Sequence, residues 1–389
     1  MPFLRVDNYN PKNNALDVIK PGLYLFSNDV LERIGFFAGA AINRQLERDL
    51  FLQFFYRSKI PLLYEAGLEP TASLELYNVT RKSGNYISLP DHLIPVNVTY
   101  DLLEFDFALT QPFLSQFSNV EFRYALSRYT SNLEDFINPY TASVVSGSSD
   151  LYLIANTFNL TFRLDAIVPS RTEDINPSGR RIMFRLGREL NKFNPDGSYQ
   201  QSSSGLLLPV YEQVNFTRME LSWQEHIPVL FRDNSLNFTF HGGTIIGPPV
   251  NEFFDFYASG LVGMKGYPFY SIGGNEIAAG GLSYRFPISN NLDFRFLQIY
   301  FDKLYASFFG DVGNAWGENN AVPRGWKGDA GAELRLESYS FYSYPTCFFF
   351  DAAYGFNRFQ RFVASSNEYV TYGKEWRFYF GVLFGFDID

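Results

Sequence analysis

Few residues in this sequence have the types and spacing that catalytic or metal chemistry needs. The chain has three histidines, His92, His226 and His241, and one cysteine, Cys347. Three scattered histidines are too few for a multi-histidine metal site, and a single cysteine excludes an intrachain disulfide and a cysteine-based metal cluster. We therefore expect no metal and no cofactor.

His241 is the residue that comes nearest to a catalytic group. It shares the polar face of an alternating segment with Asn237 and Thr239, and a lipase would need a serine within hydrogen-bond reach of it. The sequence has no Gly-x-Ser-x-Gly elbow, although a neighbouring strand could supply a serine. The Gly-Gly-Asn of residues 273–275 lacks the Lys-Ser/Thr of a phosphate-binding loop and indicates a turn. We expect Cys347 to pack as a small apolar residue and the protein not to be an enzyme.

The composition excludes several classes of protein. Aromatic residues make up 19% of the chain, the same share as charged residues, and 46% of the residues are hydrophobic. So much apolar side chain excludes disorder, and soluble domains usually carry more charge, about 25%. The net charge is −9 with no evident basic patch, so we expect no nucleic-acid partner. No run of about 18 apolar residues exists, which argues against a transmembrane helix.

The elements that must position any site are strands, because the dominant periodicity is two. At the C-terminus large apolar residues alternate from Trp376 to Ile388, with Gly381 and Gly385 on the opposite face. Similar alternation begins at Phe158 and at Leu236. Further strands are predicted over residues 35–42, 50–56, 72–79, 98–107, 119–126, 220–230, 277–286, 305–316, 327–336 and 346–356. No helical segment of useful length appears, so the sequence predicts an all-β chain.

Two all-β architectures compete, a soluble sandwich or barrel and a transmembrane barrel. Transmembrane strands need about 9–11 residues and are flanked by aromatic girdles. The abundant aromatic residues, the low charge and the apolar terminal strand favour the transmembrane barrel. Sixteen strands of about 10 residues would fit the length, with somewhat more than half the chain left for connections. The polar stretch Pro169–Gln213 is predicted to be a long connection, with a short strand near Ile182–Leu186.

Three motifs follow one another in the last third of the chain. Residues 263–275 read Gly-Met-Lys-Gly-Tyr-Pro-Phe-Tyr-Ser-Ile-Gly-Gly-Asn, a strand then ends in Tyr284-Arg-Phe-Pro287, and Ser307-Phe-Phe-Gly-Asp-Val-Gly-Asn-Ala-Trp316 follows. Their order and spacing resemble the bacterial surface-antigen superfamily, the sixteen-stranded barrels of BamA and TamA, over Gly260–Asp389. The resemblance implies a transmembrane antiparallel β-barrel whose extracellular loop carries a Val-Arg-Gly-Phe-like tetrad and folds into the lumen.

The resemblance also implies a lumenal latch. Met264-Lys265-Gly266-Tyr267 takes the place of the tetrad, and Asp311 takes the place of the strand acid that the tetrad's arginine contacts. Two residues depart from the family pattern. Lys265 replaces the planar arginine by a point charge, and Ser283 stands where another acid is expected. The alternative is that Gly263 and Gly266 mark a tight surface turn in which Lys265 is solvated.

The N-terminal part carries a second likeness. Phe37–Asn43, Arg48–Phe51 and Ser73–Tyr77 resemble barrels attached to TolB-like propellers in Bacteroidota-type bacteria. Residues 1–389 are expected to form a single barrel domain, with residues 1–18 as a linker or periplasmic lead-in.

The family resemblance implies a location in the outer membrane of a Gram-negative (diderm) bacterium, among outer-membrane lipid and lipopolysaccharide. The implied function is assembly or translocation of outer-membrane proteins through a lateral seam at the terminal strand, which contains Trp376, Gly381, Gly385 and Phe386. Implied partners are a periplasmic domain or assembly-machine subunits and client outer-membrane proteins. The alternatives are an inert anchor for a periplasmic, propeller-type domain or partner, and a plugged passive pore.

Overall fold

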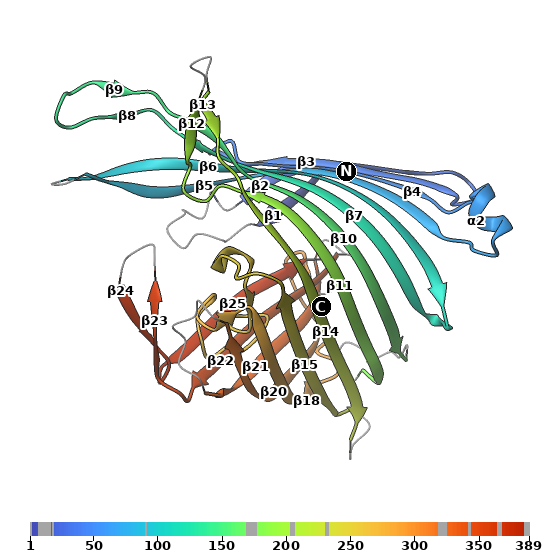
Figure 1. Cartoon of the computed structure of the whole chain (residues 1–389). Coiled ribbons are helices and arrows are strands. Elements are labelled where there is room, and N and C mark those ends of the chain that lie inside the picture. The colour runs from blue at the N-terminus through green and yellow to red at the C-terminus, as the bar shows by residue number, and fades with distance from the viewer. Residues whose placement is uncertain are drawn as a thin grey trace. The chain divides into compact units, whose positions relative to one another are not determined.

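The computed structural model describes residues 2–6, 17, 19–89, 92–168, 177–202, 207–229, 233–317, 325–340, 344–363 and 368–384. Its main feature is one antiparallel sheet, to which seventeen strands of the described residues belong (Figure 1). This confirms the all-β class. The count includes the short strands β1 (Pro2–Val6) and β19 (Phe294–Phe296), so a barrel of sixteen strands stays a prediction. Among these residues no helix is both long and apolar enough to cross a bilayer.

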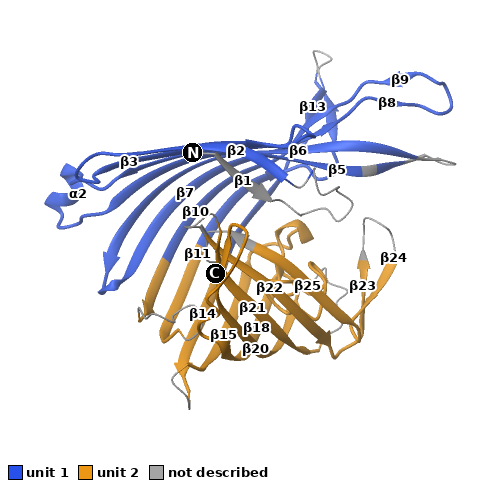
Figure 2. Ribbon diagram, turned by 180° about the vertical axis from the view of Figure 1, so that it is seen from behind, with its two compact units in different colours: residues 1–161, 187–217 blue, residues 162–186, 218–389 orange. Residues whose placement is uncertain are grey.

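The described chain divides into two compact units (Figure 2). Unit 1 comprises residues 1–161 and 187–217, and unit 2 comprises residues 162–186 and 218–389. Strands β10 (Ser149–Ile167), β11 (Gly179–Phe193) and β14 (Glu212–Pro228) have residues in both units. The expectation of a single domain over residues 1–389 stays a prediction.

Unit 1 is built mainly from long antiparallel strands paired in chain order. They are β2 (Ile19–Asn28), β3 (Ile34–Ile42), β4 (Arg48–Tyr56), β5 (Thr71–Leu89), β6 (His92–Phe113) and β7 (Ser115–Leu133). The unit also has a short helix, α2 (Pro61–Glu65), and two small hairpins, β8 (Phe136–Ile137) with β9 (Val144–Val145) and β12 (Tyr199–Gln201) with β13 (Leu207–Pro209). Residues 2–6 were expected in the lead-in, but they form β1, which pairs with β2.

Unit 2 contains a sheet in which β15, β18, β20, β21, β22 and β25 pair in that order. Its strands are β15 (Ser235–Ile246), β18 (Glu276–Ser289), β20 (Ile299–Trp316), β21 (Lys327–Ser340), β22 (Tyr344–Gly355) and β25 (Trp376–Phe384). Shorter elements lie in the connections: η1 (Glu252–Phe254), β16 (Phe256–Tyr257), β17 (Gly273–Gly274), β23 (Phe359–Val363) and β24 (Glu368–Tyr372).

One predicted connection is wrong. The stretch Pro169–Gln213 was expected to hold a short strand at most, but β11 within it runs for 15 residues. Its charged residues concealed a regular alternation, in which Phe184, Leu186 and Leu190 are exposed on one face and Arg185 and Glu189 lie between them. The polar composition of this stretch therefore predicted a connection, whereas its period-two alternation indicates the strand β11.

The sheet of unit 2 has a polar face and an apolar face. The polar face carries Asp329, Glu333 and Asp351, all nearly inaccessible to solvent. Large side chains cover the apolar face, and several are well exposed, among them Phe308 (59%), Leu334 (44%) and Phe378 (65%). Soluble proteins rarely expose so continuous an apolar surface, whereas strands that face lipid require it.

We predict that Leu334→Arg, near the middle of β21, lowers the free energy of unfolding in lipid vesicles by about 2–4 kcal/mol, because a charge would enter hydrocarbon. Tyr369→Arg is the control, because Tyr369 is 67% exposed and belongs to the separate β23–β24 hairpin. Urea unfolding followed by tryptophan fluorescence measures both. Equal effects would contradict a lipid-facing surface.

Candidate functional site

The segment of residues 247–275, which we name the clamp loop, joins β15 to β18 and is tied together by its own hydrogen bonds. The Met264 N–H donates to the Ala258 carbonyl at 2.8 Å. The Ser259 hydroxyl oxygen accepts from the N–H groups of Ser271 and Ile272, both at 3.1 Å. The paired strands β16 and β17 close the base of the loop. These bonds give the tetrad Met264–Tyr267 a defined conformation.

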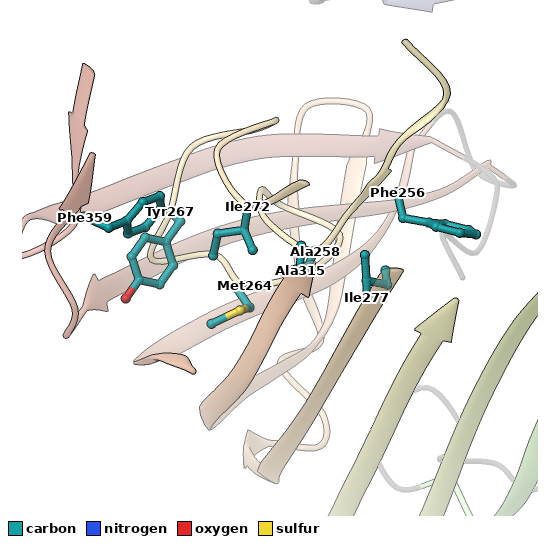
Figure 3. Packing of buried hydrophobic residues seen from close by; sticks show 8 residues of the cluster. All are labelled: Phe256, Ala258, Met264, Tyr267, Ile272, Ile277, Ala315 and Phe359. Atoms are coloured by element: carbon teal, nitrogen blue, oxygen red, sulfur yellow. The ribbon is translucent and has the colours of Figure 1, made fainter. Parts of the chain in front are cut away.

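The clamp loop has an apolar core that it shares with the sheet (Figure 3). Met264, Tyr267 and Ile272 of the loop pack in one cluster with Ile277 of β18 and Phe359 of β23. All three loop side chains are almost completely buried. Full burial of a large apolar side chain contributes about 1.5–3 kcal/mol per side chain, so the loop is packed as a core element rather than as a surface turn.

Lys265 lies at the centre of the polar contacts. Its Nζ donates to Glu333 Oε2 on β21 and to Asp351 Oδ2 on β22, each at 2.9 Å. Glu333 and Asp351 are register partners across the two strands, so one ammonium group bridges neighbouring strands. The Lys265 side chain is 18% exposed, while its acid partners are 5% and 1% exposed. The Nζ also lies 4.8 Å from the centre of the Phe309 ring, within cation–π range.

The contacts of Lys265 extend to β25 and along β21. The Tyr379 hydroxyl donates to the Lys265 carbonyl at 2.9 Å, and Tyr379 is the register partner of Asp351. Arg335 Nε lies 3.0 Å from Glu333 Oε1. The loop backbone and side chain at this one residue therefore contact β21, β22 and β25.

Gly266 and Tyr267 complete the attachment. The Gly266 N–H donates to the Asp329 carboxylate, and a Cβ at Gly266 would meet Asp329 Cβ at 2.5 Å and Gly355 N at 2.8 Å. Only glycine fits so close an approach. The Tyr267 hydroxyl donates to the Gly328 carbonyl at 2.9 Å and accepts from the Asn357 N–H at 3.0 Å.

A further attachment comes from the β23–β24 hairpin. Arg361 of β23 donates to the Tyr270 carbonyl and to Glu252 Oε2, the latter at 3.1 Å. Its guanidinium also lies 5.8 Å from the centre of the Tyr257 ring. The clamp loop is thus held on one side by the sheet and on another by this hairpin.

The structure gives Lys265 hydrogen-bond partners other than the expected Asp311. The structure joins Lys265 to Glu333 and Asp351, whereas Asp311 is the register partner of Asp329. The side chain of Lys265 bonds to acids one and two strands beyond β20, the strand that carries Asp311. The structure does not support the solvated alternative for Lys265, because two buried carboxylates hold its ammonium group.

The residue Ser283, where an acid was expected, has a different neighbour. Its register partner on β20 is Phe309, the ring that faces Lys265. The lysine is therefore bound by two carboxylates and an aromatic ring, not by a single carboxylate. The predictions from sequence missed Glu333 and Asp351 because their pairing depends on the register between β21 and β22. One signal was available: acids at alternate positions of a predicted strand indicate a polar face that could bind Lys265.

The other residues singled out from the sequence have separate environments. Gly381 of β25 lies beneath the ring of its register partner Phe349, whose Cε1 would be 2.5 Å from an added Cβ. Trp376 is exposed on the apolar face. Gly385 and Phe386 lie outside the described residues. His241 Nε2 is 3.0 Å from Glu220 Oε1.

We predict that Lys265→Ala destabilises the protein by about 3–5 kcal/mol, because it removes the cation that Asp351 contacts and one of the two that Glu333 contacts, and both carboxylates are buried. The measurement is urea unfolding in vesicles, together with limited proteolysis of the clamp loop, which should become faster. Lys265→Arg, which keeps the charge, is the matched control. An alanine variant as stable and as protease-resistant as the arginine variant would contradict the assignment.

We predict unequal losses of stability for two aspartates on the polar face. Asp351→Asn should lower stability by about 1.5–3 kcal/mol, because it removes a charge-assisted hydrogen bond from Lys265. Asp311→Asn should cause a smaller loss, because the Lys265 Nζ donates to Glu333 and Asp351 and not to Asp311, whose register partner is Asp329. The same urea unfolding assay compares the free energies of unfolding of the two variants. A greater loss for Asp311→Asn would favour Asp311 as the partner of Lys265.

Comparison with known proteins adds family evidence to this geometry. The model of the Omp85 superfamily domain matches residues 97–382, which include the clamp loop and the strands that hold it. No curated protein matches the sequence significantly.

Solved structures with a similar fold include CdiB from Escherichia coli, which is 12% identical, has a TM-score of 0.52 and is matched over 98% of this chain and 62% of that chain. CdiB from Acinetobacter baumannii is 10% identical with a TM-score of 0.49, over 93% of this chain and 57% of that chain. This chain therefore spans less than two thirds of the length of these structures. The family match covers well over half of the chain, and the chain belongs to the Omp85 superfamily of outer-membrane β-barrel proteins.

Proposed function

We propose that this chain acts in the assembly or translocation of outer-membrane proteins, with the clamp loop as a latch. The observation that carries the proposal is the contact of one loop residue, Lys265, with three successive strands. Its side chain bonds to β21 and β22 and its carbonyl accepts from Tyr379 of β25. A latch with this geometry would couple the loop to the terminal strand.

The finer proposal is a lateral opening at β25. Within the described residues β25 pairs with β22 from Trp376 to Phe384. A displaced strand edge can pair with an extended segment of a client by β-augmentation. In this proposal, loss of the Tyr379 bond to the loop frees β25.

Two other functions remain as alternatives that an experiment can separate. An inert anchor for a periplasmic domain is favoured by the number of bonds that hold the clamp loop, since Lys265, Gly266 and Tyr267 each bond to the sheet. A plugged passive pore would keep the loop inside the barrel and conduct when the loop is released. Partners in the main proposal are periplasmic domains or assembly-machine subunits and client proteins.

We predict that a photo-crosslinking residue at Phe380 of β25 captures client outer-membrane proteins in cells, whereas one at Phe308 of β20 does not. Both side chains are exposed on the apolar face, by 73% and 59%, so lipid contact is matched. Tyr379→Phe should raise the yield at Phe380. Equal yields at the two positions would contradict the seam and favour the anchor. Steady conductance in planar bilayers that appears only in Lys265→Ala would favour the pore.

A further inference from the structure

In unit 1 the apolar face of the sheet gives way to polar residues across two adjacent rows of register partners. Leu52 and Leu76 are register partners well inside this face, and both are exposed. The next row of register partners runs across four strands, from Leu50 of β4 through Asn78 of β5 and Leu103 of β6 to Arg128 of β7. Beyond that row the face is polar. We name this boundary the polar edge of β4–β7.

Two arginines stand at the polar edge. Arg48 of β4 donates through Nε to Asn78 Oδ1 at 2.7 Å and through a terminal nitrogen to Asp101 Oδ2 at 3.2 Å. Its side chain is nevertheless 47% exposed. Arg128 is exposed as well. Arg48 pairs with Asp101, and Arg128 lines the same surface, so two arginines and one aspartate give the polar edge a net positive charge.

A groove of about 800 Å³ runs along the polar edge. Arg48 and Arg128 line it at the polar side, and Leu50, Leu76 and Leu103 line its apolar part. Guanidinium groups bind phosphate oxygens with directed hydrogen bonds, and the leucines offer a surface for acyl chains. The groove therefore fits an amphiphile that has a phosphate group next to hydrocarbon.

The strand connections of unit 1 indicate which leaflet the polar edge meets. β6 and β7 are joined by the single residue Leu114, whereas at the other end of β7 residues 134–148 form a long connection with its own hairpin. In outer-membrane barrels short turns are periplasmic and long loops are extracellular. Arg128 lies toward this long connection, and so toward the outer leaflet. Arg48 begins β4 beside the short connection 43–47, and it lies next to the paired row that contains Arg128, at the same end of the sheet.

We infer that the polar edge is a binding site for a phosphate group of lipopolysaccharide, with the acyl chains along the leucines. The site is independent of the clamp loop and of the proposed assembly function. It requires only that the chain lies in an outer membrane.

The test uses native mass spectrometry of the full chain in detergent, titrated with lipid A, dephosphorylated lipid A or phosphatidylglycerol. Arg48→Gln and Arg128→Gln should each weaken lipid A binding by about fivefold, and Arg128→Lys should restore most of it. Arg57→Gln is the matched control, because Arg57 is similarly exposed but follows β4 at the opposite end. Heat-modified gel mobility identifies variants that keep the folded barrel.

Tight binding of lipid A that depends on its phosphates and on both arginines supports the inference. Unchanged binding in folded Arg48→Gln and Arg128→Gln variants would overturn it, as would an equal loss in Arg57→Gln. Binding of phosphatidylglycerol as tightly as lipid A would overturn the assignment to lipopolysaccharide, because the site would then recognise phosphate without regard to the leaflet.

Discussion

A largely shielded lysine between two buried carboxylates is the interaction on which the rest of this structure depends. Removing three charges from water is costly, and only close, well-directed contacts offset the loss of hydration. Lys265 meets this requirement with two hydrogen bonds of 2.9 Å, to Glu333 and Asp351. Because the acids come from adjacent strands, the same contact fixes the clamp loop and links β21 to β22.

The alternation of the strands makes this interaction possible. A period of two sends successive side chains to opposite faces of the sheet. The apolar face, with Phe308 and Phe378 exposed, suits lipid, while the polar face collects the acids that receive the loop. In unit 1 the same alternation stops at Arg48 and Arg128, where the apolar face gives way to charge. One sequence pattern thus accounts for membrane contact, loop attachment and the polar edge.

The sequence predicted the apolar strands well, because alternation is a local signal: β3, β4, β18 and β22 lie within a few residues of their expected ranges. The ranges predicted for β5 and β6 were too short. The outer halves of these strands, such as residues 80–89, are mostly polar on both faces, so they show no hydrophobic periodicity. The family motif located the loop residues Lys265–Tyr267. It could not give their partners, because the neighbourhood of Glu333, Asp351 and Tyr379 is created by register between strands.

The most direct measurement of the central claim is a double-mutant cycle between Lys265 and Asp351, read as free energy of unfolding in vesicles. Lys265→Met, Asp351→Asn and the double variant should show a coupling of about 0.5–3 kcal/mol, as for residues in one hydrogen-bonded pair. The parallel cycle with Asp311→Asn should show much weaker coupling. Additive effects for Lys265 and Asp351, or stronger coupling to Asp311, would contradict the clamp described here.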